Sequence, residues 1–227
     1  MKEQLLLLHG ALGSTAPFDS IIKPLENTYE VYTLNFDGHG GEPIPEHFSI
    51  DLFTNNVIDF LNTKAIDNIT VFGYSMGGYV ALNAALKVPQ KIKKIITLGT
   101  KFDWSVATAE KEVKLLNPVV IEEKLPKFAQ KLSLEHQPED WKVIMEKTAQ
   151  MMLGMANGAK LKDADFKVID IPVTLGLGSL DHMVSYDETE HVAKLLPNSK
   201  LVQLEGVKHP IDMVDKELLL NFIFSNI

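Results

Sequence analysis

The chain has 227 residues and a mass of 25.3 kDa, and its 45% hydrophobic and 23% charged residues are typical of one soluble globular domain. Its net charge of −8 disfavours binding to nucleic acid or to an anionic membrane, and the absence of cysteine excludes disulfides, thiolate metal sites and a cysteine nucleophile. All 22 basic residues are lysine, so no guanidinium can clamp a substrate carboxylate or phosphate. Because the sequence shows neither a signal peptide nor a membrane-spanning run, we expect a cytoplasmic protein without membrane insertion.

The first hundred residues alternate between segments typical of strands and segments typical of helices. Short apolar or alternating runs predict strands at 4–8, 29–35, 69–72 and 94–98. Apolar residues at a spacing of three or four predict helices at 17–25, 50–61 and 76–86. This alternation indicates a parallel sheet with helices on both faces.

The pattern changes after residue 100. Residues 101–167 contain no strand-like run but carry apolar residues at helical spacing, which predicts an all-helical insertion. Strands are predicted again at 171–177 and 200–204, each followed by a helix, at 187–196 and 215–224. We therefore expect an α/β fold with a mostly parallel sheet of about six strands. Residues 1–100 and 168–227 would form this core, and residues 101–167 would form a helical cap.

One glycine-rich sequence lies between a predicted strand and a predicted helix. It reads Gly73-Tyr74-Ser75-Met76-Gly77, a G-x-S-x-G pattern. A sharp turn from strand to helix requires a strained backbone at its apex and small residues two positions away. Ser75 would occupy that apex at a helix N-terminus, where free N–H groups favour developing negative charge. A glycine-rich turn with a capping serine is the alternative interpretation of this motif taken alone.

Other strand ends bring polar residues to the same edge. The first strand is followed by His9-Gly10-Ala11, the fifth by Asp181 and the last by His209. Ligands of open parallel sheets bind beyond the carboxyl ends of the strands. A serine is a poor nucleophile until a base takes its proton, and the base needs a carboxylate to fix its tautomer. The strand ends provide each of these groups.

These segments resemble the α/β-hydrolase fold family, specifically its small members that carry a cap. The resemblance covers nearly the whole chain and depends on four matching segments, which are His9-Gly10, Gly73-Tyr74-Ser75-Met76-Gly77-Gly78, Gly178-Ser179-Leu180-Asp181 and Gly206-Val207-Lys208-His209. The first of these segments follows the first predicted strand directly, so we expect a sheet without the first hairpin of longer family members.

The resemblance implies a role for each of these strand ends. Ser75 would be the nucleophile, His209 the general base and Asp181 the acid that orients the base. The backbone N–H groups of Ala11 and Met76 would form the oxyanion hole. This chemistry requires no cofactor.

Some residues leave alternatives open. Asp103 follows the fourth strand by a few residues and is the second candidate for the acid. His9 is expected to brace the oxyanion turn, with a substrate contact as the alternative, and His39 to support its own loop. Three further histidines are expected on the surface, namely His47, His136 and His191. No pair of histidines has ligand spacing, so we expect no metal site.

We therefore expect a serine hydrolase that cleaves a small carboxylic ester with an apolar or acyl portion. Four methionines between Met145 and Met155 would either line an acyl pocket or pack the cap onto the core. Alternatives within the same fold are a thioesterase, an amidase, a C–C hydrolase or a lyase. An alternative of a different class is a ligand receptor that retains the triad.

Overall fold

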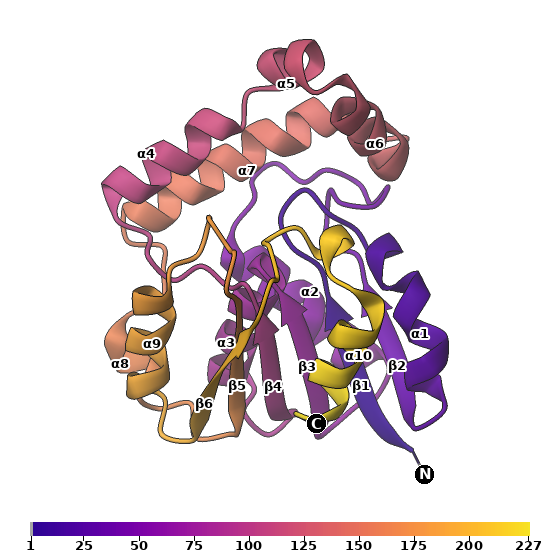
Figure 1. Cartoon of the computed structure of the whole chain (residues 1–227), viewed down its shortest axis with the longest axis vertical. Helices are drawn as coiled ribbons and strands as arrows, with labels where there is room; N and C mark the ends of the chain where they lie inside the picture. The colour runs from indigo at the N-terminus through magenta and orange to yellow at the C-terminus, as the bar shows by residue number, and fades with distance from the viewer. Residues whose placement is uncertain (1) are drawn as a thin grey trace.

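The computed structural model describes residues 2–227 and contains a six-stranded parallel sheet (Figure 1). The strand order is β2-β1-β3-β4-β5-β6. The strands are β1 (Glu3–Leu8), β2 (Tyr29–Leu34), β3 (Ile69–Tyr74), β4 (Ile92–Leu98), β5 (Val173–Gly178) and β6 (Ser199–Leu204). The predicted parallel sheet of about six strands is confirmed. β4 begins at Ile92 rather than at residue 94, because two lysines interrupt its apolar pattern in the sequence.

Helices cover both faces of this sheet. One face is covered by α1 (Asp19–Glu26) and α10 (Lys216–Phe224), and each is preceded by a short 3-10 helix, η1 (Ala16–Phe18) and η2 (Ile211–Met213). The other face is covered by α2 (Ile50–Thr63), α3 (Met76–Lys87) and α9 (Tyr186–Leu195). Because all six strands are parallel, their carboxyl ends lie at one edge of the sheet.

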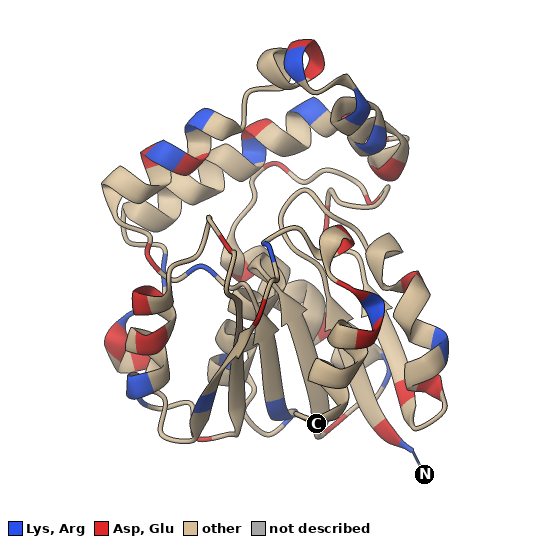
Figure 2. Ribbon diagram, in the orientation of Figure 1, with Lys and Arg blue, Asp and Glu red and all other residues tan. Residues whose placement is uncertain are grey.

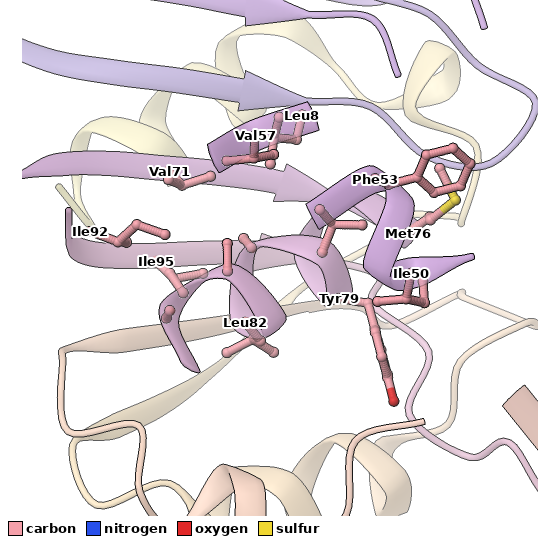
Figure 3. Close-up of a cluster of buried hydrophobic side chains, with 14 of the residues drawn as sticks. Leu8, Ile50, Phe53, Val57, Val71, Met76, Tyr79, Leu82, Ile92 and Ile95 are labelled. Carbon is pink, nitrogen blue, oxygen red and sulfur yellow. The ribbon is translucent and has the colours of Figure 1, made fainter. Parts of the chain in front are cut away.

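The strands contribute to two separate apolar cores because successive side chains of a strand point to opposite faces. Leu5 and Leu7 of β1 belong to the core beneath α1 and α10, whereas Leu6 and Leu8 belong to the core beneath α2 and α3. Figure 3 shows this second core, which also contains Val57 of α2. Burial on both faces explains why β1 has a continuous apolar sequence rather than an alternating one.

The chain between β4 and β5 is helical. It forms α4 (Val106–Leu115), α5 (Pro118–Lys124), α6 (Pro126–His136), α7 (Trp141–Ala156) and α8 (Asp163–Phe166). Helices α4 to α7 lie above the carboxyl edge of the sheet, and α8 lies beside α9 (Figure 1). We call residues 101–167 the cap segment. Helix α5 was not predicted from the sequence, because its seven residues lie between two prolines that each begin a new helix.

Charged residues lie mainly on the helices and loops that surround the sheet, and the cap segment carries both signs (Figure 2). Among residues 2–227, none of the helices combines the length and the apolar character needed to cross a bilayer.

Candidate active site

Ser75 lies at the turn between β3 and α3, with φ 51° and ψ −117°. This left-handed backbone is strained for a residue with a side chain, as the motif predicts. A Cβ at Gly73 would approach Gly78 N to 2.4 Å, and a Cβ at Gly77 would approach Leu8 O to 2.5 Å. Both distances are below any real contact, so the strand and the helix can meet this closely only with glycine at these positions.

His209 contacts both Ser75 and Asp181. Its Nε2 lies 3.3 Å from Ser75 Oγ, and its Nδ1 lies 2.8 Å from Asp181 Oδ2. The side chain of His209 is 11% exposed and that of Asp181 is 1% exposed. The structure therefore brings together three side chains in the order serine, histidine, carboxylate, although Ser75 is more than a hundred residues from the other two in the sequence.

The Asp181 carboxylate is held in its ionised form. Burial opposes that charge, but the hydrogen bond with His209, the attraction of its ring and two backbone N–H groups outweigh burial and hold the pKa of Asp181 below its ordinary value. The two backbone donors are Met183 N and Val184 N, at 2.8 and 2.9 Å from Oδ1. A carboxylate in this position fixes a proton on His209 Nδ1 and leaves Nε2 able to accept one.

Asp103, the second candidate acid, lies elsewhere. It is exposed, and its carboxylate accepts hydrogen bonds from Ser105 N at 3.0 Å and from Thr108 Oγ1 at 2.6 Å. The hydrogen bond from Thr108 holds the pKa of Asp103 below its ordinary value. These contacts connect Asp103 to the start of α4 rather than to His209.

Ala11 and Met76 line the same cavity as Ser75. Ala11 follows β1 in a turn closed by a hydrogen bond from Gly13 N to Gly10 O at 3.2 Å. Met76 is the first residue of α3, and the first N–H groups of a helix lack partners within it. The two predicted oxyanion-hole residues thus line the same cavity as the serine, one in the turn after β1 and the other at a helix N-terminus.

His9 is buried and braces the loop that follows β1, as expected. Its Nδ1 lies 2.7 Å from Gly10 O, and its Nε2 accepts a hydrogen bond from Phe36 N at 3.2 Å. Burial lowers the pKa of His9 to about 4, so the ring is neutral. His39 is also buried, with Nδ1 3.1 Å from Asp37 O in its own loop.

The prediction that His136 lies on the surface is wrong. Its side chain is fully buried at the end of α6, where Nδ1 accepts from Gly40 N at 3.0 Å and Nε2 lies 3.1 Å from Leu12 O. The sequence concealed this role, because the partners are backbone groups of two distant loops. His47 and His191 are exposed, as expected. Within residues 2–227, no group of three or more potential ligands could hold a metal ion.

Sequence reasoning missed two residues that support the site. The Tyr74 hydroxyl donates to His209 O at 3.0 Å, and the Thr100 hydroxyl donates to Ser75 O at 3.0 Å. Tyr74 occupies the variable position of the motif, and Thr100 follows the glycine that closes β4. The only feature of the sequence that could have indicated Thr100 is its position just after the end of β4.

A cavity of ≈ 310 Å³ opens next to Ser75, between the sheet edge and the cap segment. Its wall is largely apolar. Met151, Met152 and Met155 of α7 contribute to it, together with Trp104. Met145 instead packs within the cap segment, in a small core with Trp141. Three of the four methionines therefore line the cavity, and Met145 packs inside the cap segment rather than onto the sheet core.

Comparison with known proteins identifies the family. A family model described as the alpha/beta hydrolase fold matches residues 4–138. The pimeloyl-[acyl-carrier protein] methyl ester esterase of Neisseria meningitidis serogroup C is 25% identical over 227 aligned residues, which cover 91% of this chain and 86% of that protein. Ethanol acetyltransferase 1 of Cyberlindnera fabianii is 30% identical over 98 residues, and this match spans 42% of the chain and only 29% of the transferase.

Solved structures share the same architecture. The 2-hydroxy-6-oxo-6-phenylhexa-2,4-dienoate hydrolase of Rhodococcus sp. strain RHA1 superposes with a TM-score of 0.81 at 17% identity, covering 99% of this chain and 90% of the other. At this identity the likeness concerns the fold, whereas the family model matches more than half of the sequence. This chain therefore belongs to the α/β-hydrolase fold family and is one of its enzymes.

Proposed function

We propose that this enzyme is a serine hydrolase that cleaves a small carboxylic ester through an acyl-enzyme on Ser75. The observation that carries the proposal is the continuous chain of contacts from Ser75 Oγ to His209 Nε2 and from His209 Nδ1 to Asp181 Oδ2. A nucleophile, a base and an orienting carboxylate in this order are the arrangement that activates a serine for acyl transfer.

In the first half of the reaction, Ser75 Oγ attacks the ester carbonyl carbon while His209 Nε2 takes the hydroxyl proton. Ala11 N–H and Met76 N–H donate to the oxygen that becomes negative, and each such donor contributes about 3 kcal/mol of transition-state stabilisation in comparable enzymes. Collapse of the tetrahedral intermediate breaks the ester C–O bond, and His209 returns its proton to the leaving alkoxide. Asp181 stays ionised and stabilises the imidazolium that forms between these two steps.

In the second half, water replaces the alcohol. His209 takes a proton from the water as its oxygen attacks the acyl carbon, and the same N–H groups stabilise the second oxyanion. The bond to Ser75 Oγ then breaks, and the proton passes from His209 to Oγ. The products are a carboxylic acid, an alcohol and the original enzyme.

The wall of the cavity supports a substrate with an apolar acyl or alcohol portion. Methionine and tryptophan side chains there offer polarisable surface with little geometric restriction. The Neisseria relative is a methyl ester esterase by name, which agrees with an ester as the substrate. Thioesters, amides and C–C bonds would pass through the same acyl-enzyme and are the alternatives to test.

The test is hydrolysis of p-nitrophenyl esters from acetate to decanoate by the wild type and by Ser75→Ala. We expect the wild type to turn over several of these esters and to prefer a medium acyl chain that the cavity can enclose. Ser75→Ala should lose at least about 10³-fold in kcat because no other group replaces the nucleophile. Ser20→Ala, an exposed serine on α1, is the matched control. A wild type that hydrolyses none of these esters would contradict the proposal and favour the receptor alternative.

A further inference from the structure

Two ion pairs line the cavity beside Ser75, and the proposed reaction uses neither. Lys131 and Asp212 form the first, and each of these side chains is 47% exposed. The second pair is buried. Lys101, two residues beyond Gly99 at the end of β4, and Glu112 of α4 both line this cavity and form a buried ion pair. Their side chains are 12% and 4% exposed, and Lys101 Nζ lies 3.5 Å from Glu112 Oε1. The buried pair thus connects the start of the cap segment, just after β4, to helix α4, inside a wall that is largely apolar.

This pair retains hydrogen-bonding capacity. A charge-assisted hydrogen bond is normally about 2.7–2.9 Å long, so 3.5 Å is a loose contact. The Lys101 ammonium has three N–H donors and also donates to the carbonyl of Met183. Within residues 2–227, Lys101 is the only ion-pair partner of the Glu112 carboxylate. The indole Nε1 of Trp104, another residue of the wall, is buried with no acceptor in the described chain.

Packing alone does not account for the pair. Desolvation of two charges offsets most of their attraction, and a well-packed apolar pair in the same place is often equally stable or more stable. A loosely paired ammonium and carboxylate in a cavity wall instead offer a donor and an acceptor to a bound molecule. Because the pair is neutral as a whole, it favours a neutral ligand group that both donates and accepts, such as a hydroxyl or a carboxamide. A carboxylate placed there would face the charge of Glu112.

The pair and Ser75 line the same cavity. Thr100, the residue before Lys101, donates to Ser75 O, and Met183, which accepts from Lys101, donates its N–H to Asp181. Helix α4, which carries Glu112, lies above the β5 side of the sheet, whereas the turn with Ala11 follows β1 on the other side of β3 (Figure 1). The polar pair therefore lies on the β4–β5 side of the serine, and the Ala11 turn lies on the β1 side.

We propose that Lys101 and Glu112 form a specificity subsite that selects esters carrying a neutral hydrogen-bonding group on the portion that extends to the β4–β5 side of Ser75. This inference builds on the proposed ester hydrolysis and names its substrate class. Lys101 donates to the oxygen of that group, and Glu112 accepts from its O–H or N–H. The apolar remainder of the wall encloses the intervening chain.

The experiment compares three shape-matched ends on the same chain, namely carboxamide, carboxylate and isopropyl. These ends are placed on the acyl portion of p-nitrophenyl esters and, in a second series, on the alcohol portion of butanoate esters, with chains of increasing length. For at least one length, the wild type should show a kcat/KM for the carboxamide at least about tenfold above those for the other two ends, because the wrong group leaves the buried pair unsatisfied.

Two variants give effects of opposite sign on the carboxylate. Glu112→Gln leaves the Lys101 charge uncompensated, so the ratio of carboxylate to carboxamide kcat/KM should rise about tenfold or more. Lys101→Met leaves the Glu112 charge, so this ratio should fall. Glu110→Gln and Lys111→Met, two exposed positions of the same helix, are the matched controls and should leave the ratio unchanged. If Lys101→Met does not fold, the nearly isosteric Glu112→Gln decides the result alone.

A binding measurement separates failure of this inference from failure of the proposed function. Stabilisation by hexanamide and by hexanoate, measured as the shift in Tm, needs no turnover. Hexanamide should raise the Tm of the wild type more than hexanoate does, and hexanoate should raise the Tm of Glu112→Gln more than hexanamide does. If esters are hydrolysed but Glu112→Gln changes neither the carboxylate-to-carboxamide ratio of kcat/KM nor the order of the two Tm shifts, the subsite is refuted and the hydrolase proposal stands. If no ester is hydrolysed but the order of the Tm shifts given by hexanamide and hexanoate reverses in Glu112→Gln, the subsite stands and the hydrolase proposal is refuted.

Discussion

The contact between Asp181 Oδ2 and His209 Nδ1 distinguishes Asp181 from the competing acid Asp103. We predict that Asp181→Asn lowers kcat by about 10³–10⁴-fold, because an amide presents the wrong hydrogen-bonding pattern to the ring and cannot stabilise an imidazolium. Asp103→Asn is the matched control and should stay within about threefold of the wild type, since Asp103 contacts Ser105 and Thr108 at the start of α4 rather than His209. A larger loss in Asp103→Asn than in Asp181→Asn, measured with one p-nitrophenyl ester, would reverse the assignment.

The backbone of Ser75 makes a prediction that is independent of catalysis. A side chain at φ 51° is strained, whereas glycine adopts this conformation readily. Both Ser75→Gly and Ser75→Ala remove the hydroxyl, but only the first relieves the strain. We expect the unfolding free energy of Ser75→Gly to exceed that of Ser75→Ala by about 1 kcal/mol, despite the greater entropy of glycine in the unfolded chain. Urea denaturation of the two variants measures this difference, and equal stabilities would argue against stored strain.

Glycines in the sequence made Ser75, Asp181 and His209 predictable as site residues, because each lies next to a glycine-marked strand end. Tyr74 and Thr100 were not predictable in this way. Their roles depend on which backbone carbonyl lies within reach of a hydroxyl, and that is decided by the register of β3 against β4 and by the path of the last loop. Local patterns identify where a chain turns, but not which carbonyl a side chain then meets.

At the scale of helices, α6 is attached to the core through His136. We predict that His136→Ala lowers the unfolding free energy by about 2–4 kcal/mol, because Gly40 N–H and Leu12 O lose their partner in a buried region. His191→Ala is the control, since His191 is exposed and contacts only exposed Asp163, and it should change stability by less than about 0.5 kcal/mol. Because Leu12 follows Ala11, His136→Ala should also lower kcat. Retention of both wild-type stability and kcat would show that α6 does not hold this loop.

The helical content of the cap segment was predictable, but its packing was not. The apolar spacing of α7 predicted a helix, and that spacing is the same whether a methionine meets a cavity or another helix. Met145 and Met151 lie on the same helix, yet the first packs against Trp141 within the cap segment and the second lines the cavity. The difference arises from the position of α6 and the core relative to α7, which depends on contacts between distant parts of the chain.

For the molecule as a whole, the buried histidines predict a loss of stability in mild acid. The folded-state pKa of His9 is about 4, and burial also lowers those of His39 and His136. At pH values between the folded-state and the ordinary pKa values of these histidines, the unfolded chain binds more protons than the folded chain. The stability that the three neutral rings contribute is therefore fully present above about pH 6.5 and decreases as the pH falls. His9 alone accounts for about 3 kcal/mol of this loss between pH 6.5 and 4.

Urea denaturation at pH values from 7.5 to 4.5 measures this loss. The lowered pKa of Asp181 acts in the same direction at still lower pH, because its stabilising contribution is lost as the pH falls through its folded value. His47→Ala should leave the profile unchanged, since His47 is exposed. An unfolding free energy that stays constant from pH 7 to pH 5 would show that the three buried rings do not control acid stability.

The alternation of strands and helices was sufficient to predict the parallel sheet and the edge at which the site lies. It could not predict the cavity, because that space exists only where the cap segment and the sheet edge fail to fill the volume between them. The buried pair of Lys101 and Glu112 was hidden for a related reason, since one residue lies in the loop after β4 and the other in α4, and only the packing of α4 brings them together.

The most direct test of the central claim is the intact mass of the enzyme after treatment with a fluorophosphonate, followed by peptide mapping of the adduct. We predict one phosphonyl group per chain, located on Ser75, and no adduct in Ser75→Ala. Labelling of Ser75 should also slow greatly in His209→Ala, because the base that takes the serine proton is lost. A wild-type enzyme that remains unlabelled, or that is labelled equally in Ser75→Ala, would contradict the assignment of Ser75 as the nucleophile.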